Sequence, residues 1–256
     1  MSNSMQDEIQ HGEGLGQDLT DKGRGERAAF DAELILDLEA ACHFKGARVL
    51  REIISHEEQE SIRNILDSPS SDSGRPPQEC EHGGWSESQA GRRKIEFGPK
   101  VNFKSEVVRL KGALPLPKWA LSNTSSILAE ARRRGQLLDF APVELGVIEY
   151  DPCRGASIAP HIDDSWFWGE RIVTCSLLAP CVMGFIRNSR QVLVHLPSRS
   201  LLVTEGNSRY SWLHSIRRST IKSRRISLTY RELSAEFRSG GAREKDGRDV
   251  ISAMVG

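Results

Sequence analysis

Seven short runs rich in β-branched and aromatic residues follow one another between residues 143 and 231, and they limit the fold more than any other feature. The runs are Val143–Tyr150, Arg171–Leu178, Val182–Ile186, Gln191–Leu196, Ser200–Thr204, Ser211–Ile216 and Arg224–Arg231. No segment of helical periodicity separates them, so a doubly wound parallel sheet is excluded. The sequence therefore predicts an α+β chain with a mostly β core, folded as an antiparallel jelly roll (double-stranded β-helix).

Helices are expected before these strands. Apolar residues repeat at helical spacing over residues 31–41. Ser55–Glu58 reads as a capping box, which starts a helix that ends near Asp67. A further helix is expected from about residue 123 to 134, with Gly135 as its stop signal. We expect these N-terminal helices to pack on one sheet of the jelly roll.

The two ends and one internal region lack the residues of a core. Residues 1–30 are dominated by Gly, charged and amide side chains, and we expect a disordered tail there. The region 68–104 opens with a stretch dense in Ser, Pro and Gly, which is typical of a lid-like loop. The segment 239–256 is expected to fray. One domain over residues 31–238 remains, with its jelly-roll core at 143–231.

Charge, cysteine and hydropathy patterns restrict the partners. The chain of 256 residues balances 35 Lys+Arg against 35 Asp+Glu, so any affinity for nucleic acid must come from a local basic patch. Its five Cys are widely spaced without a CxxC pair, which favours reduced thiols and no structural zinc. No run approaches the roughly 18 apolar residues needed to span a bilayer, and the N-terminus lacks a secretory signal pattern. We expect no membrane partner.

The first candidate site is His161-Ile162-Asp163. Side chains alternate along an extended segment, so His161 and Asp163 share a face and could bind one ion. Such triplets also arise by chance, as in His11-Gly12-Glu13. A His from a later strand would complete a 2-His-1-carboxylate triad, which occupies one face of octahedral Fe(II). His214 is the best candidate, although a single His in a strand is more often an ordinary packed side chain.

A second candidate is the strand from Arg225 to Arg231, in which polar and apolar residues alternate. Its polar face carries Arg225, Ser227, Thr229 and Arg231. A half-solvated strand showing two arginines to water is the commoner outcome for such a pattern. Here the strand follows a candidate metal ligand, and Arg binds carboxylates through a planar fork. The polar face therefore suits a small dicarboxylate that also chelates the metal.

Together these residues resemble the Fe(II)/2-oxoglutarate dioxygenases of the AlkB family, for which the Arg-x5-Arg strand is distinctive. The strings that are similar to the AlkB homologue 4 group are Gly91-Arg92-Arg93-Lys94 with residues 98–103, then 160–171, and 225–237. The resemblance covers roughly residues 48–237. It departs at the N-terminus, where no Cys precedes Cys42 although the group usually begins with a Cys-rich segment. It departs also at the Asn-x-Tyr element, of which only Tyr150 carries over.

The resemblance implies oxidative N-demethylation with Fe(II), 2-oxoglutarate and O2, releasing formaldehyde, succinate and CO2. The residues implied are His161, Asp163 and His214 for the metal, and Arg225, Arg231 and Tyr150 for 2-oxoglutarate. The homologue 4 group implies monomethyl-lysine in protein as substrate, with actin as partner, in cytoplasm and nucleus. The wider family implies the alternative of N-methylated bases such as N6-methyladenine in nucleic acid. A third reading, from another class, is a jelly-roll interaction module with a vestigial site.

Substrate contacts are open at this stage. Trp166 and Trp168 at the expected mouth could stack on a base, enclose a methylammonium group or simply pack. Two basic clusters could meet phosphates. One comprises Arg92, Arg93, Lys94, Lys100 and Lys104, and the other comprises Arg209, Arg217, Arg218, Lys222, Arg224, Arg225 and Arg231. The alternative has equal weight: these charges serve the dianionic cosubstrate or are merely solvated.

Overall fold

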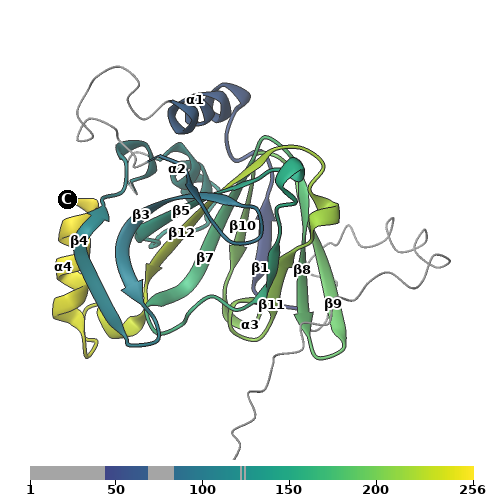
Figure 1. The fold of residues 1–256 in the computed structure, drawn as a ribbon. Helices are drawn as coiled ribbons and strands as arrows, with labels where there is room; N and C mark the ends of the chain where they lie inside the picture. The colour runs from purple at the N-terminus through teal and green to yellow at the C-terminus, as the bar shows by residue number, and fades with distance from the viewer. Residues whose placement is uncertain (1–43, 69–83, 122, 124) are drawn as a thin grey trace, which may run out of the picture. The chain divides into compact units, whose positions relative to one another are not determined.

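The computed structural model describes residues 44–68, 84–121, 123 and 125–256, and these form two antiparallel β-sheets (Figure 1). The larger sheet contains, in spatial order, β1 (Ala47–Leu50), β10 (Ser200–Thr204), β7 (Trp168–Leu177), β12 (Arg225–Leu233), β5 (Pro142–Tyr150), β3 (Arg93–Asn102) and β2 (Ser86–Glu87), and β4 (Val107–Leu114) pairs with β3. The smaller sheet contains β6 (Ile158–His161), β11 (Leu213–Ile216), β8 (Cys181–Arg187) and β9 (Arg190–Leu196).

The chain crosses between the two sheets several times from β5 onward. Strands β5, β7, β10 and β12 belong to the larger sheet, while β6, β8, β9 and β11 belong to the smaller one. Every described strand pair is antiparallel. The predicted antiparallel jelly roll with a mostly β core is therefore confirmed.

Two helices cover one face of the larger sheet, as expected. Helix α1 (His56–Asp67) begins with the predicted capping box: the Ser55 hydroxyl accepts from the Glu58 amide, and the Glu58 carboxylate accepts from the Ser55 amide. Helix α2 spans Ser126–Arg133. The buried faces of both helices form one hydrophobic cluster with the apolar side chains of β5, β7 and β12. The opposite face of these strands is left for the site.

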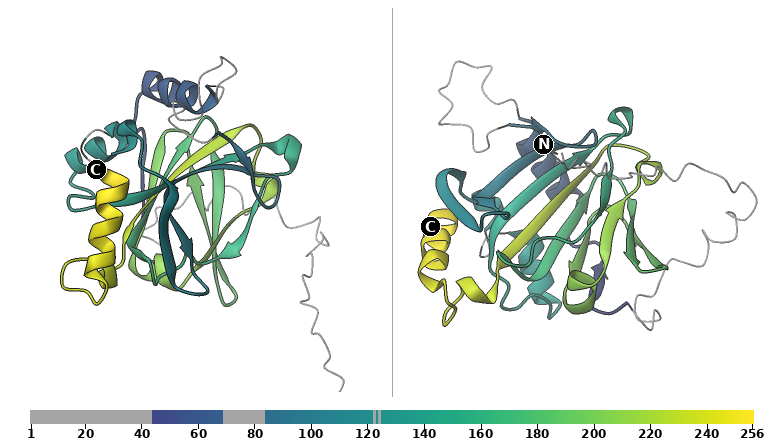
Figure 2. Two further views of the ribbon diagram at one scale, coloured as in Figure 1. Left: turned by 60° about the vertical axis from the view of Figure 1, so that its left-hand side comes forward. Right: turned by 60° about the horizontal axis from the view of Figure 1, so that its bottom comes forward.

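The expectation of a frayed C-terminus is wrong. Helix α4 (Glu244–Val255) lies at the end of the larger sheet that carries β4 (Figure 2). Gly247, Val250 and Met254 form its buried face, and a Cβ on Gly247 would lie 1.7 Å from the Phe237 carbonyl oxygen. This face is narrow and stands among charged residues. Its packing partners come from distant segments, so local pattern gives little sign of it.

The structure describes only part of the region 68–104, for which a lid-like loop is expected. Residues 69–83 lie outside the described ones, as do the predicted tail at 1–30 and the predicted helix within 31–41. Residues 93–102, however, form the long strand β3, which pairs with β5 and then with β4. Ile95 and Phe97 are buried and Glu96 between them is exposed, which is the period of a strand with one covered face. The lid expectation is wrong for these ten residues.

Among the described residues, the helices are too short and too polar to cross a membrane.

Candidate metal centre

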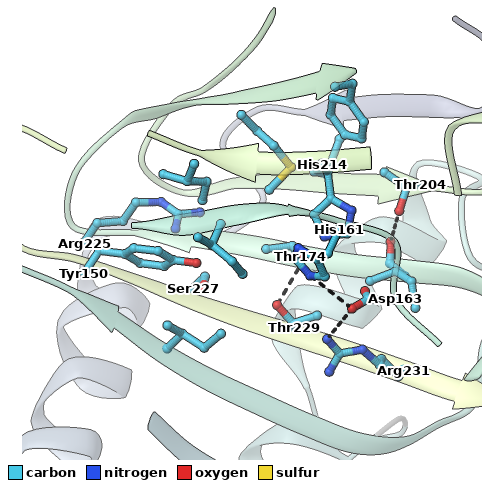
Figure 3. A pocket seen from close by; sticks show the side chains of 17 residues that line it. Tyr150, His161, Asp163, Thr174, Thr204, His214, Arg225, Ser227, Thr229 and Arg231 are labelled. Atoms are coloured by element: carbon cyan, nitrogen blue, oxygen red, sulfur yellow. Dashed lines mark hydrogen bonds and ion pairs between the residues drawn. The ribbon is translucent and has the colours of Figure 1, made fainter. Parts of the chain in front are cut away.

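The predicted ligands converge between the two sheets. His161 ends β6 and stands directly opposite His214 of β11 in the strand register, with ring centroids 4.2 Å apart. Asp163 follows two residues later and turns toward both rings (Figure 3). The nearest ligand atoms of the three side chains all lie within 4.8 Å of one another. This donor set, two imidazoles and one carboxylate, fits the facial triad that binds Fe(II).

The protonation states suit a metal. Burial lowers the pKa of His214 to about 4, so its imidazole is neutral at pH 7. Burial opposes ionisation of Asp163, but the Arg231 guanidinium and His161 hold the pKa of that carboxyl well below its usual range. The Nδ1 of His161 is 2.9 Å from the Ala159 carbonyl oxygen, which leaves Nε2 facing Asp163 at 3.7 Å. Such a contact fixes the ring and its tautomer.

Arg225 supplies a separate anion site. Its side chain is fully buried, its Nη2 donates to Ser176 at 2.8 Å, and its Cζ stands 5.1 Å from the Tyr150 ring centroid. Its Nε and Nη1 are buried without a partner among the described residues. A buried guanidinium with two unsatisfied nitrogens is costly unless a ligand binds it. The site therefore fits one carboxylate of a small dicarboxylate such as 2-oxoglutarate, with Tyr150 alongside.

Arg231 lies beside Asp163, at the other end of the pocket from Arg225 and Tyr150 (Figure 3). Its Nη1 is 2.7 Å from a carboxylate oxygen of Glu144, and its Nη2 is 3.3 Å from Asp163 Oδ1. The register of β12 is irregular directly after Arg231, against both neighbouring strands. Two of its nitrogens thus contact carboxylates, while its Nε is buried without a partner among the described residues. Arg231 holds the Asp163 ligand, and because it also lines the pocket its contact with 2-oxoglutarate stays a prediction.

A larger cavity of about 740 Å³ adjoins the triad. Trp168, Phe103, Glu144, Lys94 and Lys100 are among its lining residues. Trp168 is buried, and its ring centroid is 6.3 Å from that of Phe103, which is 43% exposed. A cavity of this size suits a substrate group. Phe103 and Glu144 were not among the predicted site residues, because only the fold brings them beside the triad.

Trp166 does not lie at the mouth of the site, so that expectation is wrong. Its ring packs edge-on against Phe237 at 5.2 Å, and the Arg243 guanidinium lies 5.1 Å from it. It borders a different cavity from Trp168. The two residues differ because β7 begins only at Trp168, so the strand alternation that would place both on one face does not yet hold at Trp166.

Most of the predicted phosphate contacts are engaged within the protein. Arg93 forms a two-point contact with Glu149 at 2.6 and 2.8 Å. Arg224 binds Glu149 and Asp67, and the Arg92 Nε donates to the Gln89 carbonyl oxygen. Lys94 pairs with Glu96 at 2.8 Å, although it also lines the larger cavity. Arg93 and Arg224 thus pair with a buried carboxylate, which neither the phosphate reading nor the expected cosubstrate or solvated role had included.

Replacing Glu149 with Gln is expected to lower the free energy of unfolding at pH 7 by about 3 kcal/mol, because arginines would lose their shared buried carboxylate. Burial opposes its ionisation, but Arg93, Arg224 and Arg154 hold the pKa of Glu149 at about 2. The folded-state pKa thus lies below the ordinary value of 4.5. The stabilisation by ionised Glu149 is complete at pH values above 4.5 and is lost as the pH falls toward 2.

Urea denaturation of wild type and Glu149→Gln at a series of pH values checks this. The difference between the two proteins should shrink as the solution is acidified. Glu130→Gln is the control, because Glu130 also pairs with two arginines, but its side chain is 22% exposed against 1% for Glu149, and pairs reached by solvent contribute little. Equal destabilisation by both changes would contradict the prediction.

Comparisons with known proteins show the family of this chain. Residues 46–231 match the model of the 2OG-Fe(II) oxygenase superfamily. The chain is 34% identical over 243 residues to human alpha-ketoglutarate-dependent dioxygenase alkB homolog 4, covering 81% of this chain and 74% of that protein. It is 32% identical to a Caenorhabditis elegans protein named DNA N6-methyl adenine demethylase, covering 83% of this chain and 69% of that protein. A solved structure described as that of OsALKBH1 aligns with a TM-score of 0.53 at 18% identity, over 73% of this chain and 96% of that one, and it supports the fold.

Proposed function

This chain belongs to the AlkB family of the 2OG-Fe(II) oxygenase superfamily and is an oxidative demethylase, and we propose that its substrate is monomethyl-lysine in a protein. The observation that carries the proposal is the composition of the cavity beside the triad. Trp168 and Phe103 contribute aromatic rings to its lining, and Glu96 and Glu144 contribute carboxylates, which also pair with Lys94 and Arg231. Rings and carboxylates together suit a methylated ammonium group. Actin is the candidate partner, from the resemblance to the homologue 4 group, and a cytoplasmic and nuclear location is proposed with it.

The side chains of the pocket divide the work. His161, Asp163 and His214 would hold the iron, and Arg225 would bind the distal carboxylate of 2-oxoglutarate. Fe(II) with 2-oxoglutarate and O2, when bound, supplies the oxidation of an N-methyl group that ends in formaldehyde, succinate and CO2. The apolar walls of the pocket exclude water from this step, and the fixed ligand face sets where the methyl group must approach.

A nucleic-acid substrate is the second candidate. The similarity to the worm N6-methyl adenine demethylase favours it, and Lys94 and Lys100 on the cavity wall could meet phosphates. Trp168 and Phe103 could equally stack on a base. The vestigial-module reading has less support, because the triad is complete and Arg225 keeps two unpartnered donors.

Formaldehyde release tests the proposal. The full chain, loaded anaerobically with Fe(II) and 2-oxoglutarate and then exposed to O2, is given either a monomethyl-lysine peptide of actin sequence or an oligonucleotide containing N6-methyladenine. We expect release from the peptide and none from His161→Ala. Release from the oligonucleotide alone, with binding that weakens steeply as salt rises, would overturn the protein-substrate proposal in favour of nucleic acid. Imaging of the tagged full chain tests its location.

A further inference from the structure

A buried arginine connects the two segments that carry the metal ligands. Arg209 belongs to α3 (Gly206–Tyr210), just before His214 on β11, and is only 3% exposed. Its Nη1 donates to the main-chain carbonyl oxygen of Asp163 at 2.7 Å, and its Nη2 donates to that of Asp164. One guanidinium therefore spans from the segment before one ligand to the loop that holds another.

The loop that carries Asp163 has no strand partner of its own. β6 ends at His161 and β7 begins only at Trp168, so Asp163 lies between two strands. The Asp164 side chain accepts from the Phe167 amide at 2.9 Å, which shapes the far end of the loop. Arg231 contacts the carboxylate of Asp163, while Arg209 holds its main chain. The two arginines thus fix different parts of the same ligand.

The helix that carries Arg209 is itself well anchored. The Ser208 amide donates to the Lys45 carbonyl oxygen at 2.9 Å, and the Gly206 amide donates to Glu170 at 2.6 Å. Trp212, which is 1% exposed, donates from its indole to the Asn207 side chain at 2.6 Å. These contacts tie α3 to the segments of Lys45 and Glu170 and to Trp212, which follows the helix. Arg209 therefore extends from a fixed base.

The hydrogen bonds of the Arg209 side chain all go to main-chain carbonyl oxygens of the Asp163 loop. Its Nε is buried without a partner among the described residues, and its two other donors go to carbonyl oxygens. A buried charge often adds no more stability than an apolar side chain of similar volume would. The contacts of Arg209 instead fix two adjacent carbonyl groups.

We propose that Arg209 is a positioning residue that holds the main chain at Asp163, so that the carboxylate stands opposite His161 and His214 before the metal arrives. The inference rests on the metal site proposed above and is independent of the substrate. Outer contacts that orient metal ligands change metal affinity by roughly 10- to 100-fold when removed. Arg209 has the same relation to Asp163, through the backbone.

Mn(II) binding to the full chain, measured by calorimetry without 2-oxoglutarate or substrate, tests this. Arg209→Gln should weaken Mn(II) binding by roughly 10- to 100-fold. Arg209→Lys should recover part of the loss, because an ammonium group can still reach one carbonyl. The absorption bands of bound Co(II) should shift in Arg209→Gln, since they report the geometry of the ligands.

Arg134→Gln is the matched control. Arg134 also donates to two main-chain carbonyl oxygens, those of Arg51 and Glu52, at 2.7 and 2.8 Å, but it lies outside the pocket. Its Mn(II) affinity should equal that of wild type. A folded Arg209→Gln protein with wild-type affinity would overturn the inference. So would loss of the native fold in both Arg209 variants, because Arg209 would then serve the fold and not the ligand. Absence of Mn(II) binding by wild type would instead refute the metal site itself.

Discussion

Replacing His214 with Ala is expected to abolish formaldehyde release, with a loss of at least about 10³-fold, because the reaction depends wholly on the bound cofactor. The change removes one of three ligands and leaves His161 and Asp163 too few to hold Fe(II) against water. The measurement is twofold: formaldehyde and succinate produced per enzyme, and iron content after removal of loosely bound metal. Both should fall together.

His195→Ala is the matched control for this change. His195 is also a strand histidine, on β9, but it is exposed and lies outside the pocket. That variant should retain full iron content and turnover. A His214→Ala protein that keeps stoichiometric iron and turns over would contradict the assignment of the triad.

Replacing Arg225 with Met should raise the dissociation constant for 2-oxoglutarate by about 10²-fold, which corresponds to about 3 kcal/mol for lost hydrogen bonds to a charged carboxylate. Met keeps much of the length of the side chain and leaves no buried charge behind. Calorimetry with Mn(II)-loaded protein under anaerobic conditions measures the constant. Affinity for Mn(II) itself should not change, because Arg225 is not a ligand.

The neighbouring residue gives the control for Arg225. Arg224 pairs with Glu149 and Asp67 and does not line the pocket. Arg224→Met should therefore leave 2-oxoglutarate affinity unchanged, although it removes the same chemical group one residue earlier. If Arg225→Met also binds 2-oxoglutarate as wild type does, the cosubstrate site lies elsewhere.

Strand alternation made much of the site predictable from sequence. The period of two placed Arg225, Ser227 and Thr229 on one face of β12, and all three line the pocket. His161 and Asp163 do meet, but β6 ends at His161, so the loop and its contacts with Arg209 and Arg231 place Asp163, and not the strand period. The pairing of His161 with His214 depends on which strands are neighbours, and no local pattern reveals that. Only the preference of Fe(II) for two histidines and one carboxylate pointed to His214.

What the sequence could not reveal depends on tertiary partners. Nothing in the local pattern indicates that Arg209 meets two carbonyl groups or that Glu144 stands opposite Arg231, because these contacts join residues 46 and 87 positions apart. The charges of Arg93 and Arg224 suggested phosphates, since the buried carboxylate that pairs with them is an ordinary-looking strand residue. Helix α4 was missed for the same reason, because the surface it covers is assembled from other segments.

Strand β12 contributes one face to the hydrophobic core and the other to the pocket, so stability and catalysis depend on the same strand register. Ile226, Leu228 and Tyr230 belong to the cluster under α1 and α2, while the residues between them face the pocket. A shift of β12 by one position against β5 and β7 would turn its arginine side chains into the hydrophobic core. The same shift would turn Ile226, Leu228 and Tyr230 toward the pocket. Misaligned molecules would be too unstable to accumulate. A screen of variants for thermal stability would thus also remove those in which a register shift misplaces the pocket residues of β12.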